Sequence, residues 1–135
     1  MIVGVGIDSI EIERFNQWHT YAIGTLGRIF SSSEIDYCLS ISAKSAERFA
    51  ARFAAREAFY KALSGVNPAR QIPFLKVCKN INLEKAANGY QQMNVKWQSL
   101  LEHTEETYSQ LKVHLSLTHN QAQAFAFVIL ERLDS

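Results

Sequence analysis

Apolar and polar positions alternate along the first residues of the chain. From Ile2 to Ile7 the side chains fall in turn on two faces, which is the period of a β-strand. Gly4 and Gly6 share one of these faces, and because glycine has no side chain, another backbone or a helix can approach closely there. Beyond the strand, the apolar spacing predicts a short helix that begins at Asp8 or Ser9.

The strongest helical pattern lies in the middle of the chain. The residues from Ser45 to Leu63 are rich in alanine and free of glycine and proline, and Ser64-Gly65 ends the run. Such a helix is suited to close packing on a sheet. Before it, Ser31-Ser32-Ser33-Glu34 has the Ser-x-x-Glu spacing of a capping box, which predicts a second short helix.

The segments after the long helix show a mixture of strand, turn, helix and loop patterns. Alternation from Phe74 to Cys78 favours a strand, and Asn88-Gly89 marks a turn. The apolar residues between Val95 and Leu101 indicate another short helix. We expect the polar residues 103–110 to form an exposed loop.

A β-hairpin is predicted at the C-terminal end. Leu111 to Thr118 alternates strictly, and a turn near Asn120 leads into a second apolar strand. No linker and no internal repeat interrupts the chain. Residues 1–135 are therefore expected to form a single α+β domain, in which a mainly antiparallel sheet packs on one long helix.

Composition agrees with such a domain and narrows the class of protein. The 135 residues are 47% hydrophobic, enough for a packed core, and 20% charged, which argues against long disorder. No apolar run approaches the ~20 residues that cross a bilayer, and the first residues lack a signal peptide's basic stretch. We expect a cytoplasmic protein with no membrane contact. Cys38 and Cys78 lack metal-ligand spacing and are expected to be buried free thiols.

The charges are distributed unevenly. A net charge of +1 gives no general attraction for nucleic acid, and no nucleic-acid partner is expected. The segment from residue 44 to residue 70 nevertheless carries a basic excess over Glu47 and Glu57, which suggests an anionic partner. Its basic residues are Lys44, Arg48, Arg52, Arg56, Lys61 and Arg70.

Three places hold polar residues that could carry chemistry, and the first is Asp8. It follows directly on an apolar strand. With Glu11 three positions later, Asp8 could simply be the N-cap of the predicted helix. Both interpretations of Asp8, functional group and helix cap, remain open from the residues alone.

The second place is the long helix. Glu57 and Lys61 are four residues apart and share a face, so a surface ion pair would account for them. Arg48, Arg52 and Arg56 also repeat every four residues. This stripe could be a solvated face, but its interleaving with phenylalanines also favours partly enclosed arginines that face a phosphate-bearing ligand.

The third place is the end of a predicted strand, at Ser116-Leu117-Thr118-His119. A histidine at a strand end is often a hydrogen-bonded structural residue, so His119 alone decides nothing. Taken together with the helix, however, Asp8 and Glu57 could supply two hard oxygen ligands for Mg²⁺. Substrate phosphates and water would complete its octahedron, and the nearby cations would bind the same phosphates.

These residues resemble the motifs of the holo-acyl-carrier-protein synthases, the small bacterial class of 4′-phosphopantetheinyl transferase. The resemblance spans nearly the whole chain, and its motifs occur in the family's order. They are Gly4-x-Gly6-Ile7-Asp8 with Glu11-x-x-Arg14-Phe15, Arg52-Phe53-Ala54-Ala55-Arg56-Glu57-Ala58-x-x-Lys61-Ala62, and Ser116-Leu117-Thr118-His119. Two departures are a family lysine replaced by Arg56 and a Gly-x-Pro turn represented only by Gly89-Tyr90-Gln91, and the polar loop after Trp97 is longer than typical.

The resemblance implies a fold and a reaction. The fold is that of the 4′-phosphopantetheinyl transferases. The reaction moves the 4′-phosphopantetheine group of coenzyme A to a serine of apo acyl carrier protein, releases adenosine 3′,5′-bisphosphate and supports fatty acid biosynthesis. Asp8 and Glu57 would hold Mg²⁺, Lys61 would stabilise the pyrophosphate oxygens, and Glu57 or a metal-held water would accept the serine proton.

The same resemblance implies binding surfaces. Arg14 and Arg28 would dock the acidic carrier protein, and the enzyme would be a homotrimer that holds coenzyme A between subunits. The coenzyme A site would be lined by Arg52, Arg56, Lys61, Ser116 and His119.

Two other functions remain open from sequence. A transferase that serves the carriers of peptide or polyketide synthases would use the same chemistry on other partners. A nucleic-acid module built on the arginine stripe would belong to a different class, but it would leave Asp8 and Glu57 without a role.

Overall fold

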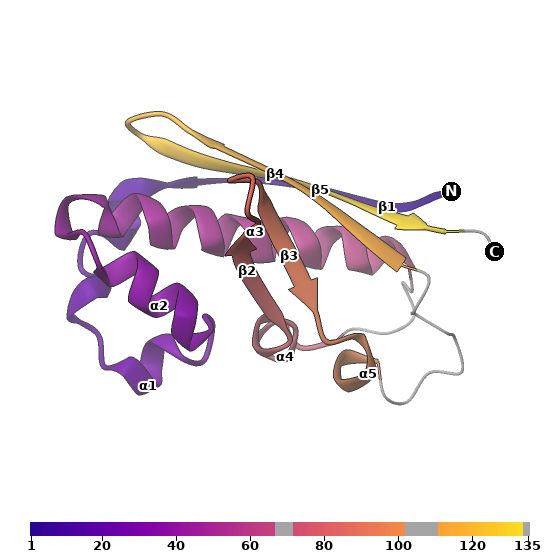
Figure 1. The fold of residues 1–135 in the computed structure, drawn as a ribbon, viewed down its shortest axis with the longest axis horizontal. Helices are drawn as coiled ribbons and strands as arrows, with labels where there is room; N and C mark the ends of the chain where they lie inside the picture. The colour runs from indigo at the N-terminus through magenta and orange to yellow at the C-terminus, as the bar shows by residue number, and fades with distance from the viewer. Residues whose placement is uncertain (67–71, 102–110, 134–135) are drawn as a thin grey trace.

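The computed structural model describes residues 1–66, 72–101 and 111–133. Three antiparallel strands form the main sheet, in the order β1-β5-β4, and the long helix α3 (Ser45–Val66) lies across one face of it (Figure 1). The strands are β1 (Ile2–Glu11), β4 (Leu111–His119) and β5 (Gln123–Arg132). A mainly antiparallel sheet packed on one long helix is therefore confirmed.

Smaller elements cover the other side of α3, so that the helix lies between two layers (Figure 1). A second, two-stranded antiparallel sheet consists of β2 (Ile81–Lys85) and β3 (Gln91–Val95). The short helices are α1 (Ile23–Leu26), α2 (Ser32–Leu39), α4 (Phe74–Lys79) and α5 (Trp97–Leu100), with 3₁₀ turns η1 (Ile12–Phe15), η2 (Trp18–Thr20) and η3 (Ser42–Lys44).

The backbones of β1 and α3 touch where β1 has no side chains. Gly4 and Gly6 are buried on the face of β1 that α3 covers, whereas Val5 and Ile7 point outward. A Cβ atom added to Gly6 would overlap the carbonyl oxygen of Ala58, and one added to Gly4 would overlap that of the residue one turn later in α3. The predicted close approach at the two glycines is confirmed.

The first strand is longer than the sequence predicts. β1 continues through Asp8 to Glu11 and stays paired with β5 up to Gln123, and the following helix begins only at Ile12. Its cap position is Glu11, which makes no side-chain capping bond. The predicted start at Asp8 or Ser9 is wrong because the antiparallel ladder to β5 continues to satisfy the backbone there. Asp8 is therefore not an N-cap.

A buried ion pair ties α2 to α3. Ser31 caps α2 as predicted, with its Oγ accepting from the backbone N–H of Glu34 at 3.3 Å. The Glu34 carboxylate, however, turns into the protein, where Nη2 and Nη1 of Arg56 donate to its two oxygens at 2.6 and 2.8 Å. Arg56 also donates to the carbonyl of Ile81, and the N–H of Leu83 donates to Glu34. These bonds compensate two charges that solvent cannot reach.

In the segment after α3, two further predictions of secondary structure are wrong. Phe74–Lys79 is a helix rather than a strand: Pro73 precedes it, the N–H of Val77 donates to the Pro73 carbonyl, and Val77 and Cys78 are buried side by side. Short apolar runs fit either period, so here the proline was the better signal. The strands β2 and β3 around the Asn88-Gly89 turn were not predicted, and Val95 ends β3 instead of starting a helix.

Other expectations are confirmed. Gly89 adopts a positive φ of 83° in its turn, and the β4–β5 hairpin turns at Asn120, whose side-chain oxygen accepts from two backbone N–H groups. Cys38 and Cys78 are free and buried, and burial raises the pKa of each thiol to about 12. The predicted loop 103–110 lies outside the described residues.

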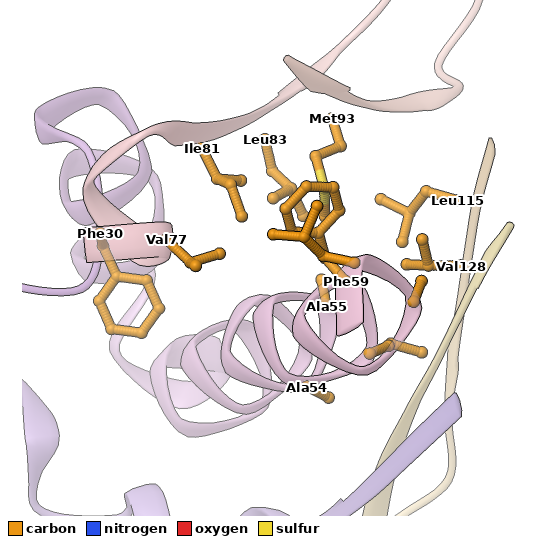
Figure 2. Packing of buried hydrophobic residues seen from close by; sticks show 14 of the residues in the cluster. Phe30, Ala54, Ala55, Phe59, Val77, Ile81, Leu83, Met93, Leu115 and Val128 are labelled. Carbon is orange, nitrogen blue, oxygen red and sulfur yellow. The ribbon is translucent and has the colours of Figure 1, made fainter. Parts of the chain in front are cut away.

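The core fills the space between α3 and the surrounding sheets. Figure 2 shows Ala54, Ala55 and Phe59 of α3 among apolar side chains from both layers. The helix thus contributes buried surface on several sides, which explains its high alanine content. Among the described residues, no helix has the length and apolar character needed to cross a membrane.

We predict that Gly6→Ala strongly destabilises the protein. The added methyl group cannot be accommodated without moving α3 away from β1, and overpacking of this kind costs about 1–3 kcal/mol. Urea denaturation measures the change in unfolding free energy. Gly24→Ala is the matched control, because a Cβ atom there meets nothing within 4 Å. Equal stability of the two variants would contradict the close backbone contact.

Candidate active site

The contact between β1 and α3 brings Asp8 to Lys61. Asp8 lies two residues after Gly6, on the same side of β1, and its side chain is 15% exposed. The Nζ atom of Lys61 donates to Asp8 Oδ1 at 3.2 Å and to the carbonyl oxygen of Ile7 at 3.0 Å. The Lys61 side chain is half-exposed, so this ion pair opens to solvent.

Glu57 lies one helical turn before Lys61 and completes this group of charges. Partial burial raises the pKa of the Glu57 carboxyl above its usual value, and the negative charge of Asp8 raises it further. Lys61 and Arg14 lower the same pKa, but they do not cancel the increase. Asp8, Glu57, Lys61 and Arg14 therefore lie within electrostatic reach of one another.

The donor set of Asp8 and Glu57 suits a hard divalent cation. Two partly buried carboxylates repel each other, and a cation between them would remove that cost. Within residues 1–66, 72–101 and 111–133, no group of three or more histidine, cysteine or carboxylate side chains could hold a metal. A cation bound by these two carboxylates would therefore need several further oxygens from water or substrate, which is the coordination typical of Mg²⁺.

Arg52 and His119 lie elsewhere. Lys61 is about two and a half helical turns from Arg52, so the two side chains leave α3 on opposite faces. Arg52 lines a hollow of about 320 Å³ between α3, α2 and the end of β4. His119 borders the same hollow, and its Nε2 lies 3.5 Å from Glu47 Oε2. One chain therefore carries two separate charged sites.

Two other predicted ligand residues do not join either site. Arg56 has no exposed side-chain surface, because its guanidinium is bound to Glu34, and this contradicts the expectation that it lines a ligand site. Ser116 pairs with Phe127 and faces away from α3, into a hollow of about 720 Å³ beside β3. Strand alternation separates Ser116 from His119, which lies three residues later on the other face.

The two arginines predicted to dock a partner are both exposed. Arg14 belongs to η1 and lies close enough to Glu57 to lower its pKa. Arg28 follows α1. The described structure thus places Arg14 beside the Asp8 site, on the side of the molecule formed by the N-terminal elements.

Sequence reasoning missed two polar residues. Tyr37 lines the same hollow as Arg48 and Arg52, and Glu34 holds the buried ion pair. The four-residue spacing of Arg48 and Arg52 indicated a shared face of the helix, but nothing in the pattern placed Tyr37 on it. Glu34 looked like an ordinary capping residue, and only the tertiary structure reveals its burial.

Comparison with known proteins identifies the family of the chain. A family model described as the 4′-phosphopantetheinyl transferase superfamily matches residues 4–127. The chain is 35% identical to the holo-[acyl-carrier-protein] synthase of Bacillus subtilis over 136 residues, covering all of both chains. It is 34% identical over 131 residues to that of a Clostridium perfringens strain, covering 97% of this chain and 95% of the relative.

Solved structures of the same kind share the fold. A holo-(acyl-carrier-protein) synthase from Bacillus anthracis, in complex with CoA (3′,5′-ADP), is 28% identical with a TM-score of 0.72, and 98% of each chain is covered. The acyl carrier protein synthase of Mycobacterium tuberculosis is 29% identical with a TM-score of 0.70, over 98% of this chain and 99% of the other. The chain therefore belongs to the 4′-phosphopantetheinyl transferase superfamily, among the holo-[acyl-carrier-protein] synthases.

Proposed function

We propose that this protein transfers the 4′-phosphopantetheine group of coenzyme A to a serine of apo acyl carrier protein, in the service of fatty acid biosynthesis, and releases adenosine 3′,5′-bisphosphate. The observation that carries the proposal is the group of Asp8, Glu57 and Lys61, held together by β1 and α3. Proteins named holo-[acyl-carrier-protein] synthase match nearly the whole chain, and the structure of one of them contains CoA (3′,5′-ADP).

The reaction assigns a distinct role to each charge. The serine hydroxyl oxygen attacks the phosphorus that bears pantetheine, and the bond from that phosphorus to the bridging oxygen of the pyrophosphate breaks. The bond electrons leave with adenosine 3′,5′-bisphosphate. Glu57, or a metal-held water beside it, accepts the serine proton, because this carboxylate lies beside Lys61 at the site proposed for the pyrophosphate. Lys61 stabilises the charge that develops on the pyrophosphate oxygens.

Asp8 and Glu57 would hold Mg²⁺ in this site. The ion supplies charge neutralisation at the pyrophosphate when it is bound. Lys61 would bind the pyrophosphate oxygens beside the two carboxylates, and its bonds to Asp8 and to the Ile7 carbonyl fix the position of its ammonium group.

The second site suits the rest of coenzyme A. Lys44, Arg48, Arg52 and His119 border the hollow at the end of β4, against a single carboxylate, Glu47. Such a basic hollow is complementary to the remaining phosphate, the 3′-phosphate group. It lies on the β4 side of the main sheet, whereas Asp8 lies on the β1 edge. One ligand can reach both sites if the β1 edge of one copy faces the β4 edge of the next.

A ring of copies provides that arrangement, and we propose the homotrimer that the family resemblance implies. The outer face of the main sheet is apolar, with Val5, Ile7 and Phe127 54, 62 and 40% exposed. Ile7 pairs with Phe127, and Val5 pairs with Ile129, so these side chains form one patch. An apolar patch of this kind on a sheet face is typical of a protein interface. Head-to-tail contacts that close into a ring would cover it in every copy.

A direct assay tests the proposed function. The protein is incubated with coenzyme A, Mg²⁺ and apo carrier proteins, and mass spectrometry measures addition of phosphopantetheine to each carrier. Transfer to the fatty acid carrier supports the proposal. Transfer only to carriers from peptide or polyketide synthases would favour the alternative partner class, and no transfer to any carrier would contradict the reaction.

We predict that Glu57→Gln abolishes most of the transfer but raises the melting temperature of the metal-free protein. The neutral amide removes a charge that burial and Asp8 both disfavour, so the fold gains stability while the site loses its base. Thermal denaturation and the transfer assay measure the two effects. Added Mg²⁺ should raise the melting temperature of the wild type and not that of the variant. An active Glu57→Gln protein would contradict the assignment.

The oligomer yields a second prediction. Phe127→Glu should give a monomer by light scattering, and transfer should fall at least tenfold because the two sites no longer meet. Leu75→Glu is the control, since this exposed residue of α4 lies away from the sheet face. Mixing two inactive proteins, Glu57→Gln and Arg52→Ala, should restore part of the activity if each site is shared between copies. A fully active Phe127→Glu monomer would contradict the ring.

Carrier docking is the third prediction. An acidic carrier needs local positive charge, because the net charge of the chain is only +1. The exposed Arg14 and Arg28 supply it, and Arg14 lies beside the Asp8 site. Arg28→Glu should raise the apparent KM for apo carrier and weaken the salt dependence of kcat/KM, because exposed charges are screened within ~8 Å at physiological ionic strength. Arg14→Glu should act in the same direction. Binding of coenzyme A by Arg28→Glu without carrier should barely change, and an equal loss there would place docking elsewhere.

A further inference from the structure

The ring of Tyr37 gathers positive charge from two elements. The guanidinium carbon of Arg48 lies 3.9 Å from the ring centroid, and that of Arg52 lies 4.4 Å from it. The Nζ atom of Lys85, from β2, lies 5.5 Å from the same centroid. Among the described residues, no other aromatic ring has more than one cation over it.

Such a group of like charges is unfavourable by itself. Its members repel one another, and the negative face of the Tyr37 ring offsets only part of that repulsion. Arg48 is further anchored, because its Nη1 donates to the carbonyl oxygen of Tyr37 at 2.7 Å and to Ser40 Oγ at 3.0 Å. Arg48 is therefore held in place over the ring.

Arg52 is only partly neutralised within the protein. The residue is 5% exposed, and its Nη1 donates to the carbonyl oxygen of Arg48 at 3.4 Å. The nearest carboxylate oxygen, Glu34 Oε2, lies 3.9 Å from its Nε and already accepts from Arg56. An enclosed guanidinium that shares its carboxylate with a second arginine and borders a hollow is suited to an anionic ligand.

We propose that Tyr37 is a positioning residue, whose ring holds Arg48 and Arg52 in the orientation that binds the 3′-phosphate group of coenzyme A. This inference rests on the proposed function, because it takes coenzyme A as the ligand of the hollow. Tyr37 borders the same hollow, but its part is to hold the two guanidinium groups close together. The ring removes the freedom of two long side chains before the ligand arrives, and this lowers the entropic cost of binding.

The experiment separates the ring from the hydroxyl group. In Tyr37→Leu, calorimetry should show a dissociation constant for adenosine 3′,5′-bisphosphate about five- to tenfold weaker than in the wild type, as expected for loss of cation–π contacts in a partly buried site. The KM for coenzyme A should rise by a similar factor, with kcat within about twofold, because the reacting atoms lie at the other site. Tyr37→Phe retains the ring and should restore wild-type binding.

Two comparisons make the result specific. Tyr90→Leu removes an exposed tyrosine that has no cation over its ring among the described contacts, and it should leave the dissociation constant unchanged. Adenosine lacks phosphate groups, so any weak binding of it should not differ between the wild type and Tyr37→Leu.

Several results would overturn the inference. They are unchanged bisphosphate affinity in a folded Tyr37→Leu protein, a loss confined to kcat, or a Tyr37→Phe variant as weak as Tyr37→Leu. The binding measurement needs no carrier and no turnover. Failure of the proposed transfer would thus appear in the mass assay, whereas failure of the Tyr37 inference appears in calorimetry.

Discussion

The direct contact of two backbones, β1 against α3, is the constraint on which the rest of the molecule depends. Gly4 and Gly6 allow the carbonyl oxygens of α3 to approach the strand where any side chain would overlap them. The same approach brings the residue two positions further along β1, Asp8, within hydrogen-bond distance of Lys61. If helix and strand lay further apart, the short side chain of Asp8 would no longer reach Lys61, and the site would lose this contact. The family motif therefore combines the glycines and the aspartate for one geometric reason.

The long helix serves two sites on opposite faces. Glu57 and Lys61 point toward β1, whereas Arg48 and Arg52 point toward α2 and β4. The interior between these faces is filled by small and apolar side chains, so neither site can shift toward the other within one chain. This separation supports the proposal that coenzyme A, with a pyrophosphate and a further phosphate, lies between copies rather than inside one.

Sequence alone predicted the parts of the fold and site that depend on local spacing. The alternation of the C-terminal hairpin, the alanine-rich helix and the shared face of Glu57 and Lys61 all follow from periodicity and are confirmed. The predictions that failed have two causes, tertiary bonding that overrides a local signal and a short apolar run that fits either period. Asp8 fits a helix cap by composition, but the ladder to β5 continues past it, and Phe74–Lys79 fits a strand although it is a helix. Helical spacing could also have separated Lys61 from Arg52, because about two and a half turns lie between them.

Arginine in place of lysine at position 56 changes the hydrogen bonds of the residues around it, although the charge is the same. The family commonly has lysine at this position, and an ammonium group is a point donor that cannot make two parallel bonds to a carboxylate. The planar guanidinium of Arg56 occupies both oxygens of Glu34 and also bonds the Ile81 carbonyl. Glu34 then has little capacity left for Arg52, whose Nε stays 3.9 Å away. Because α2 carries both Glu34 and Tyr37, the pair that neutralises Arg56 also fixes the helix that holds Tyr37 against Arg52. Glu34 is thus bonded mainly to Arg56, and Arg52 retains positive charge beside the hollow.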